Sequence, residues 1–179
     1  MKISAVSALV YSQKYVWAGI IIAIFLTGCG YRFAGGGSLP AGIQTIAVNI
    51  LKNRTSETGL ENVVTNDLIY EFIRKGKTVE KNSKKADAVL SGAIESSHIT
   101  TISRQSQQSP LERQIEITVN LKLTGSDARV IWSASRISDY EAYKVASNKQ
   151  ATEMNKRRAI ETLSKRLAEK IHNRLTENF

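Results

Sequence analysis

Residues 114–125 alternate apolar and polar side chains without a break, and this pattern restricts the fold more than any other stretch of the 179-residue chain. A period of two places alternate side chains on opposite faces of a β-strand. One face of this strand is therefore expected to be buried and the other solvated, as in an antiparallel sheet that is covered on one side. The apolar set is Ile115, Ile117, Val119, Leu121 and Leu123.

Further strands are predicted on both sides of this segment. A break or bulge is expected near Gly92, because glycine within a strand often marks such a site. The sequence Gly125-Ser126-Asp127 favours a turn, so the strand before it and the strand after it most simply pair as an antiparallel hairpin. The additional strands are residues 43–51, 78–80, 86–103 and 129–143.

Two segments show helical periodicity instead. The first begins near Gly59 and ends at Lys75-Gly76, where a basic residue and a glycine favour a C-terminal cap. The second covers residues 150–176. The order of elements predicts an α+β fold, a two-layer sandwich with a mixed, mostly antiparallel sheet of about four strands and both helices packed on one face. The apolar stripes of the helices are Leu60, Val64, Leu68 and Phe72, and Ile160, Leu163, Leu167, Ile171 and Leu175.

Residues 1–28 have the features of a cleaved lipoprotein signal peptide. Residues 16–26 are an apolar run that is too short to cross a bilayer, which takes about 20 residues, and only basic charges precede it. Leu26-Thr27-Gly28-Cys29 resembles a bacterial lipobox, so Cys29, the only cysteine, is predicted to carry the lipid anchor. Several acyl chains on one residue anchor a protein stably. Residues 29–42 would be the lipidated end and a glycine-rich flexible tether, and residues 43–179 a single domain.

Composition limits the classes of partner. The formal net charge is +9, and it becomes +7 without residues 1–28, which favours anionic partners. A single cysteine excludes an intrachain disulfide framework and a thiolate zinc cluster. Nucleic acid is the usual partner of a basic domain, but an export signal argues against it. The anionic partners at an outer membrane are lipopolysaccharide phosphates and phospholipid head groups.

No residue pattern indicates catalysis, a resident metal or a cofactor. His98 lies among serine and threonine residues of a predicted strand, and His172 follows the apolar stripe of the last helix, where we expect a surface residue. Most of the basic residues of that helix, between Lys156 and Arg174, are expected to form a solvated face. Residues 35–37 are all glycine but lack the lysine and hydroxyl residue of a phosphate-binding loop.

The stretches "CGYRFAGGGSLPAGIQTIAVNILKNRTSETGLE" (29–61) and "RQIEITVNLKL" (113–123), together with the amphipathic C-terminal helix, resemble the LPS-assembly lipoprotein LptE family. The resemblance implies a non-enzymatic lipoprotein on the periplasmic side of the outer membrane, which binds lipopolysaccharide (LPS) and plugs the β-barrel protein LptD. It also implies basic LPS contacts on loops at one end of the domain. Arg104 and Lys144 match such positions, and Lys149 lies close to Lys144 in the sequence.

Two other functions remain open at this point. One is a lipid-anchored interaction subunit of a different cell-envelope export or cell-wall complex, which needs only the anchor and a protein-binding face. The other is an envelope hydrolase, which would need a deep pocket with clustered carboxylates or a buried pair of His98 and an acid.

Overall fold

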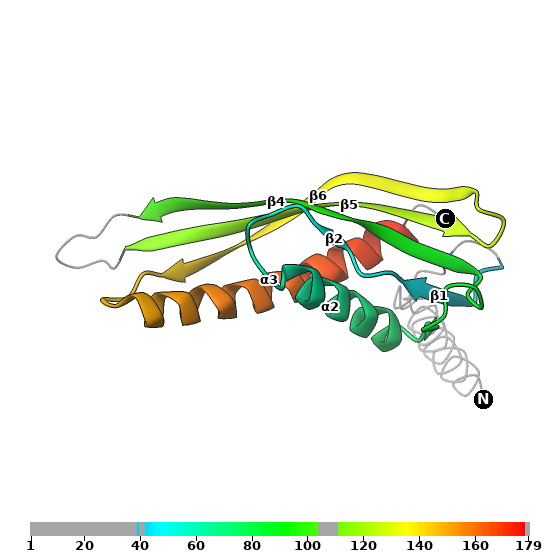
Figure 1. Ribbon diagram of the computed structural model, residues 1–179, viewed down its shortest axis with the longest axis horizontal. Coiled ribbons are helices and arrows are strands. Elements are labelled where there is room, and N and C mark those ends of the chain that lie inside the picture. Colours follow the sequence, from blue (N-terminus) through cyan, green and yellow to red (C-terminus); the bar gives the residue numbers. More distant parts are fainter. Residues whose placement is uncertain (1–38, 40–41, 104–110, 178–179) are drawn as a thin grey trace, which may run out of the picture. The chain divides into compact units, whose positions relative to one another are not determined.

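The computed structural model describes Leu39 and residues 42–103 and 111–177, all within one compact unit, Gly35–Phe179. Six strands form a single sheet, and two helices lie together on one side of it (Figure 1). In chain order the elements are β1 (Thr45–Val48), β2 (Lys52–Asn53), α2 (Leu60–Arg74), β3 (Thr78–Val79), β4 (Ala88–Ser103), β5 (Glu112–Gly125), β6 (Val130–Lys144) and α3 (Lys149–Thr176).

The sheet is mixed, as predicted, and the α+β class is confirmed. The strand order is β3-β1-β4-β5-β6, and β2 pairs with β4 further along the same edge as β1. β1 is parallel to both β3 and β4, β2 is parallel to β4, and β4, β5 and β6 run antiparallel. The expected count of about four strands is too low. β3 was expected at residues 78–80, but β2, which has only two residues, was not expected as a separate strand.

The predicted strand at residues 43–51 is interrupted. β1 pairs with residues 88–90 of β4 and β2 pairs with residues 93–94, so the chain leaves the sheet edge between them. Leu51 turns inward there: its side chain is buried and its backbone N–H donates to Thr65 Oγ1 of α2 at 3.1 Å. The burial of Leu51 against α2 thus separates β1 from β2, which would otherwise form one strand.

Gly92 occupies the position where the edge strands separate. A Cβ atom at this residue would lie 2.1 Å from the carbonyl oxygen of Asn120 on β5, so only glycine permits this close approach of the two strands. The predicted irregularity of β4 is present, but its register with β5 shifts a little further along, between Ile94 and Ser96.

The hairpin of β5 and β6 and the alternation in β5 follow the prediction. All five apolar residues of β5 are buried, while the residues between them are partly or fully exposed. The two helices cover this buried face, hereafter the inner face (Figure 1). The opposite, outer face carries small polar side chains, among them Ser91, Ser96, Thr118, Thr124 and Ser133.

The core lies between the inner face and the two helices. The apolar stripes predicted for both helices are buried, which confirms that α2 and α3 pack on the same face of the sheet. The stripe residues and the inner strand residues belong to one hydrophobic cluster. This cluster supplies most of the apolar burial that stabilises the fold, and it leaves the outer face free for polar contacts.

Candidate functional site

Lys144 and Lys149 lie at the end of the sheet where β6 passes into α3. Both side chains are exposed, and neither forms an ion pair with another residue that the structure describes. Hydrogen bonds fix the turn between these two lysines. The Asn148 side chain accepts a hydrogen bond from Ala151 N at 2.8 Å and caps α3, while Asn155 Nδ2 donates to the Lys144 carbonyl at 2.9 Å. The two ammonium groups are therefore displayed from an ordered backbone.

Arg104 and Cys29 lie outside the described residues, so the structure assigns neither a place. The described chain stops at Ser103 and resumes at Leu111, beside Lys144: Ser103 pairs with Glu112, Glu112 pairs with Lys144, and Val145 N donates to the Leu111 carbonyl at 2.9 Å. The segment that contains Arg104 thus begins and ends at the same end of the sheet as Lys144.

Most of the basic residues of α3 are exposed, as predicted, but some of them also pair with acids of the fold. Lys156 Nζ lies 3.1 Å from a carboxylate oxygen of Glu57, and both side chains are largely buried. Arg166 bonds to Asp139 at 3.1 Å and also to Glu141. The acidic side chains of β6 point to the inner face toward α3, a pairing that the spacing within the helix could not reveal.

Side chains of α3 also bind the open edge of β6. Lys170 Nζ donates to the Ser138 carbonyl at 2.7 Å, and Arg166 donates to the Tyr140 carbonyl. Together with Asn155 at Lys144, these residues satisfy three strand carbonyls that have no neighbouring strand. A helix that covers a sheet edge in this way prevents uncontrolled strand pairing.

His172 is buried, whereas the sequence predicted a surface residue. Its side chain is 1% exposed and packs edge-on against Phe72 of α2, with ring centroids 5.4 Å apart. Neither ring nitrogen has a hydrogen-bonding partner among the described residues. Burial lowers the pKa of His172, Lys75 and Lys77 add to this effect, and Glu71 opposes it. The apolar stripe of α3 is thus wider than the sequence pattern indicated, because α2 covers the next position as well.

The described residues contain no group of three or more histidine, cysteine, aspartate or glutamate side chains placed to hold a metal ion. His98 is exposed on β4, opposite Glu116 of β5, and is not part of a buried pair with an acid. No helix in the described part of the chain has the length and apolar character needed to cross a bilayer.

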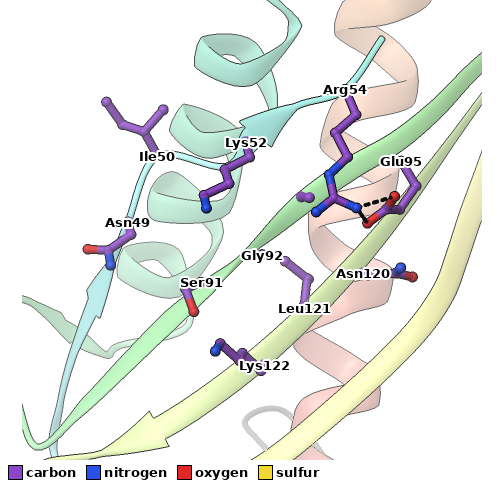
Figure 2. Close-up of a pocket in the computed structure, with 11 residues that line it drawn as sticks. Asn49, Ile50, Lys52, Arg54, Ser91, Gly92, Glu95, Asn120, Leu121 and Lys122 are labelled. Atoms are coloured by element: carbon purple, nitrogen blue, oxygen red, sulfur yellow. Dashed lines mark hydrogen bonds and ion pairs between the residues drawn. The ribbon is translucent and has the colours of Figure 1, made fainter.

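A hollow of about 500 Å³ opens on the outer face where β2, β4 and β5 lie side by side (Figure 2). Arg54 and Glu95 form one wall through two hydrogen bonds of 2.9 Å. The sequence did not predict this site. Lys52 and Lys122 are far apart in the chain and line the same hollow only because β2 and β5 both pair with β4. The remaining polar and apolar side chains of the lining include Asn49, Ile50, Lys52, Ser91, Asn120 and Lys122.

Comparison with known families gives one match. A family model described as LptE, lipopolysaccharide-assembly, matches residues 43–175. The match extends over the sheet and both helices. No curated protein sequence matches the chain.

Solved structures show a similar fold at low sequence identity. Uncharacterized lipoprotein B from Nitrosomonas europaea is 12% identical, with a TM-score of 0.56 over 83% of this chain and 92% of its own. Minor lipoprotein from Acinetobacter baumannii is 12% identical, with a TM-score of 0.52 over 76% and 92%. Rare lipoprotein B from Shewanella oneidensis is 10% identical, with a TM-score of 0.51 over 75% and 95%. These similarities concern the fold alone.

Proposed function

The chain belongs to the LptE family of lipopolysaccharide-assembly proteins, and from this membership we propose that it is a non-enzymatic outer-membrane lipoprotein that works with an LptD-like β-barrel. In this role it is anchored through Cys29 on the periplasmic side, binds LPS and plugs the barrel. The observation that carries the proposal is the family match, because it extends over nearly the whole described domain.

The outer face of the sheet supports a role inside a barrel. Its exposed side chains are largely polar: Ser96, Thr100 and Ser133 are small and uncharged, and His98 and Lys122 are larger. The interior of outer-membrane barrels is polar. A protein surface that contacts the inner wall of a barrel therefore needs hydrogen-bonding groups rather than apolar ones. The inner face is already covered by α2 and α3 (Figure 1).

Co-purification tests the partnership. The full-length lipoprotein, isolated with mild detergent from outer membranes, is expected to bring with it a large β-barrel protein in constant ratio. Absence of any barrel would contradict the proposal. Recovery of a different envelope complex in a cross-linking experiment would instead favour a lipid-anchored interaction subunit of that complex.

The anchor has its own test. Cys29→Ser is expected to abolish lipidation and signal cleavage, so the chain should keep its higher mass and lose the mass of the acyl chains. Ser38→Ala, a change in the proposed tether, is the matched control and should leave both masses unchanged. An unlipidated parent chain with residues 1–28 removed would contradict the role given to Cys29.

Arg104, Lys144 and Lys149 are proposed to contact LPS phosphates, because lysine and arginine donate charge-assisted hydrogen bonds to phosphate oxygens. The pair Lys144→Gln and Lys149→Gln should weaken LPS binding several-fold, and Arg104→Gln should do the same by itself. The control pair is Arg158→Gln and Lys165→Gln. These two cations of α3 are exposed, and replacing them removes the same charge. Equal losses in both pairs would show a general charge effect and contradict the assigned contacts.

A further inference from the structure

We propose that the hollow on the outer face of the sheet binds a phosphorylated sugar, with the phosphate held between Lys52 and Lys122 and the sugar hydroxyl groups bound by Asn49 and Ser91. This inference goes beyond the proposed function, since it assigns a second ligand site away from Lys144 and Lys149. It follows from the unpaired lysines of the hollow, its unused polar groups and its organised wall (Figure 2).

Two of the three cations that line the hollow are unpaired, and the third, Arg54, is bound to Glu95. Lys52 and Lys122 come from β2 and β5, and neither has an ion-pairing or hydrogen-bonding partner among the described residues. Elsewhere Arg166 and Lys156 are neutralised by nearby carboxylates. Two unpaired ammonium groups that line the same concave site create a local positive potential that attracts an anion.

The wall of the hollow is organised without a ligand. Arg54 donates two hydrogen bonds to Glu95, so this pair contributes no net charge. Asn120 Oδ1 accepts a hydrogen bond from Arg136 N at 2.7 Å, which fixes this carboxamide against β6. A site whose side chains are already positioned loses less conformational entropy when a ligand binds.

Part of the hollow lies along a stretch of β4 backbone that has no strand partner on the side of β1 and β2. This stretch is Ser91 and Gly92, where β1 has ended and β2 has not yet begun to pair. Gly92 cannot be replaced without a clash, because its Cβ would meet Asn120 O. That Cβ would point to the inner face, beside Leu121, so Gly92 serves the close packing of β4 on β5 beneath the hollow. Ser91, the residue before it, has its side chain on the outer face and can bind a ligand hydroxyl there.

Volume and charge together select the class of ligand. The hollow of about 500 Å³ is in the range of small-molecule sites. Its uncompensated charge is that of two lysines, which matches a phosphate monoester of about −1.5 to −2 at neutral pH. Asparagine and serine side chains supply both donors and acceptors, as a hydroxylated ligand requires, and Ile50, which is 67% exposed, gives the rim an apolar contact.

The hollow is well separated from the other basic site. Lys122 and Glu112 lie on the same strand, and Glu112 is the residue that pairs with Lys144. At about 3.3 Å per residue, this stretch of β5 measures roughly 33 Å. One sugar phosphate cannot bridge that distance, so binding at the hollow can be measured independently of LPS contact at Lys144.

The test uses the mature lipoprotein in detergent, labelled with ¹⁵N. Titration with glucose 1-phosphate should shift the amide signals of Ser91, Gly92 and Lys122 in a saturable way, while glucose alone should bind more weakly. Inorganic phosphate at the same concentration should shift them less. Equal effects of phosphate and glucose 1-phosphate would show a simple anion site and overturn the assignment of a sugar.

Matched variants locate the binding. Lys52→Gln with Lys122→Gln should weaken glucose 1-phosphate binding about tenfold or more, as the loss of two charge-assisted contacts predicts. Lys81→Gln with Lys84→Gln removes the same charge from exposed positions before β4 and should leave affinity unchanged. Unchanged binding in the first pair, with unshifted signals outside the hollow to show an intact fold, would overturn the proposal.

A second ligand distinguishes a soluble sugar phosphate from the head group of a lipid. A glycolipid with the same phosphorylated sugar as its head group, presented in micelles, is compared with the free sugar phosphate. Tighter binding of the glycolipid would support a lipid head group as the natural ligand, and equal binding would support a soluble sugar phosphate. Failure of both to bind would overturn this inference and leave the proposed barrel partnership untouched.

Discussion

On the inner face of the sheet, Arg166 and Lys170 reach from α3 to the carboxylates and carbonyls of β6. On the outer face, Lys52 and Lys122 line a hollow and have no partner among the described residues. The two faces therefore use the same residue types for different purposes. Cations that are paired with the fold contribute to stability, whereas unpaired cations remain available for a ligand.

The difference arises from what lies opposite each cation. Asp139 and Glu141 occupy inward positions on β6, directly paired with the buried Ile117 and Ile115 of β5. The helix that covers these acids must supply positive charge, because buried or half-buried carboxylates without a partner are costly. In the hollow, the one carboxylate, Glu95, is already bound by Arg54.

The largest expected effect tests the inner face as the source of stability. Leu167 is fully buried between α3 and the sheet, so Leu167→Ala should lower the free energy of unfolding by about 3 kcal/mol through the cavity it leaves. Ser133→Ala on the outer face should change it by no more than about 0.5 kcal/mol. Urea denaturation measures both, and similar losses would contradict the assigned roles of the two faces.

The next effect concerns pH and His172. Its pKa is lowered in the folded state from its ordinary value of 6.5, so the unfolded chain binds the proton more readily. The free energy of unfolding should thus be highest above pH 6.5 and fall below it by up to about 1.4 kcal/mol per pH unit, until the lowered folded pKa is reached. Denaturation between pH 7.5 and 5.5 measures this slope.

Variants identify the histidine responsible for that slope. His172→Leu should flatten the pH dependence, because no titratable ring remains between α2 and α3. The chain has two histidines, and the other, His98, is exposed, so His98→Gln is the control and should keep the slope. A slope that survives in His172→Leu would contradict the burial of a neutral imidazole.

A smaller effect is expected at the contact between α3 and β6. Arg166→Gln removes the bonds to Asp139, Glu141 and the Tyr140 carbonyl, and should cost about 1 kcal/mol, since the guanidinium is 43% exposed and partly screened. Arg158→Gln, on the same helix and exposed, should change stability by less than about 0.5 kcal/mol. Equal effects would mean that the ion pairs contribute no measurable stability.

The smallest effect is expected in the hollow. Lys52→Gln with Lys122→Gln should leave the free energy of unfolding within about 0.5 kcal/mol of the parent, because no protein contact is lost. The same variant should lose ligand binding, as proposed above. A clear loss of stability would show that the two lysines serve the fold and would remove the contrast between the faces.

Local patterns in the sequence predicted much of the fold. The alternation in β5, the stripes at Leu68 and Leu167 and the turn after Gly125 each depend on neighbours within a few residues, and the structure confirms them. β2 was not separated from β1 by such patterns, whereas the short strand β3 was expected at residues 78–80. Their pairing with β4 and β1 is parallel and depends on residues distant in the chain.

The candidate sites also differ in whether the sequence alone could identify them. Lys144 was selected because it matches a position of the LptE family, and Lys149 lies close to it in the sequence. The structure has both exposed, Lys144 at the end of β6 and Lys149 at the start of α3. The hollow could not be selected, since no spacing links Lys52 to Lys122. His172 was misassigned because its burial depends on Phe72 of another helix.

By itself, the sequence determined which elements form and which of their faces are apolar, because side-chain periodicity is a property of each segment. It also carried the patterns that resemble the LptE family, and a match over residues 43–175 then showed membership of that family. Only the tertiary structure decided which cations are neutralised and which remain free. The energy of a charge depends on the groups that packing brings within a few ångströms of it, and those groups come from other parts of the chain.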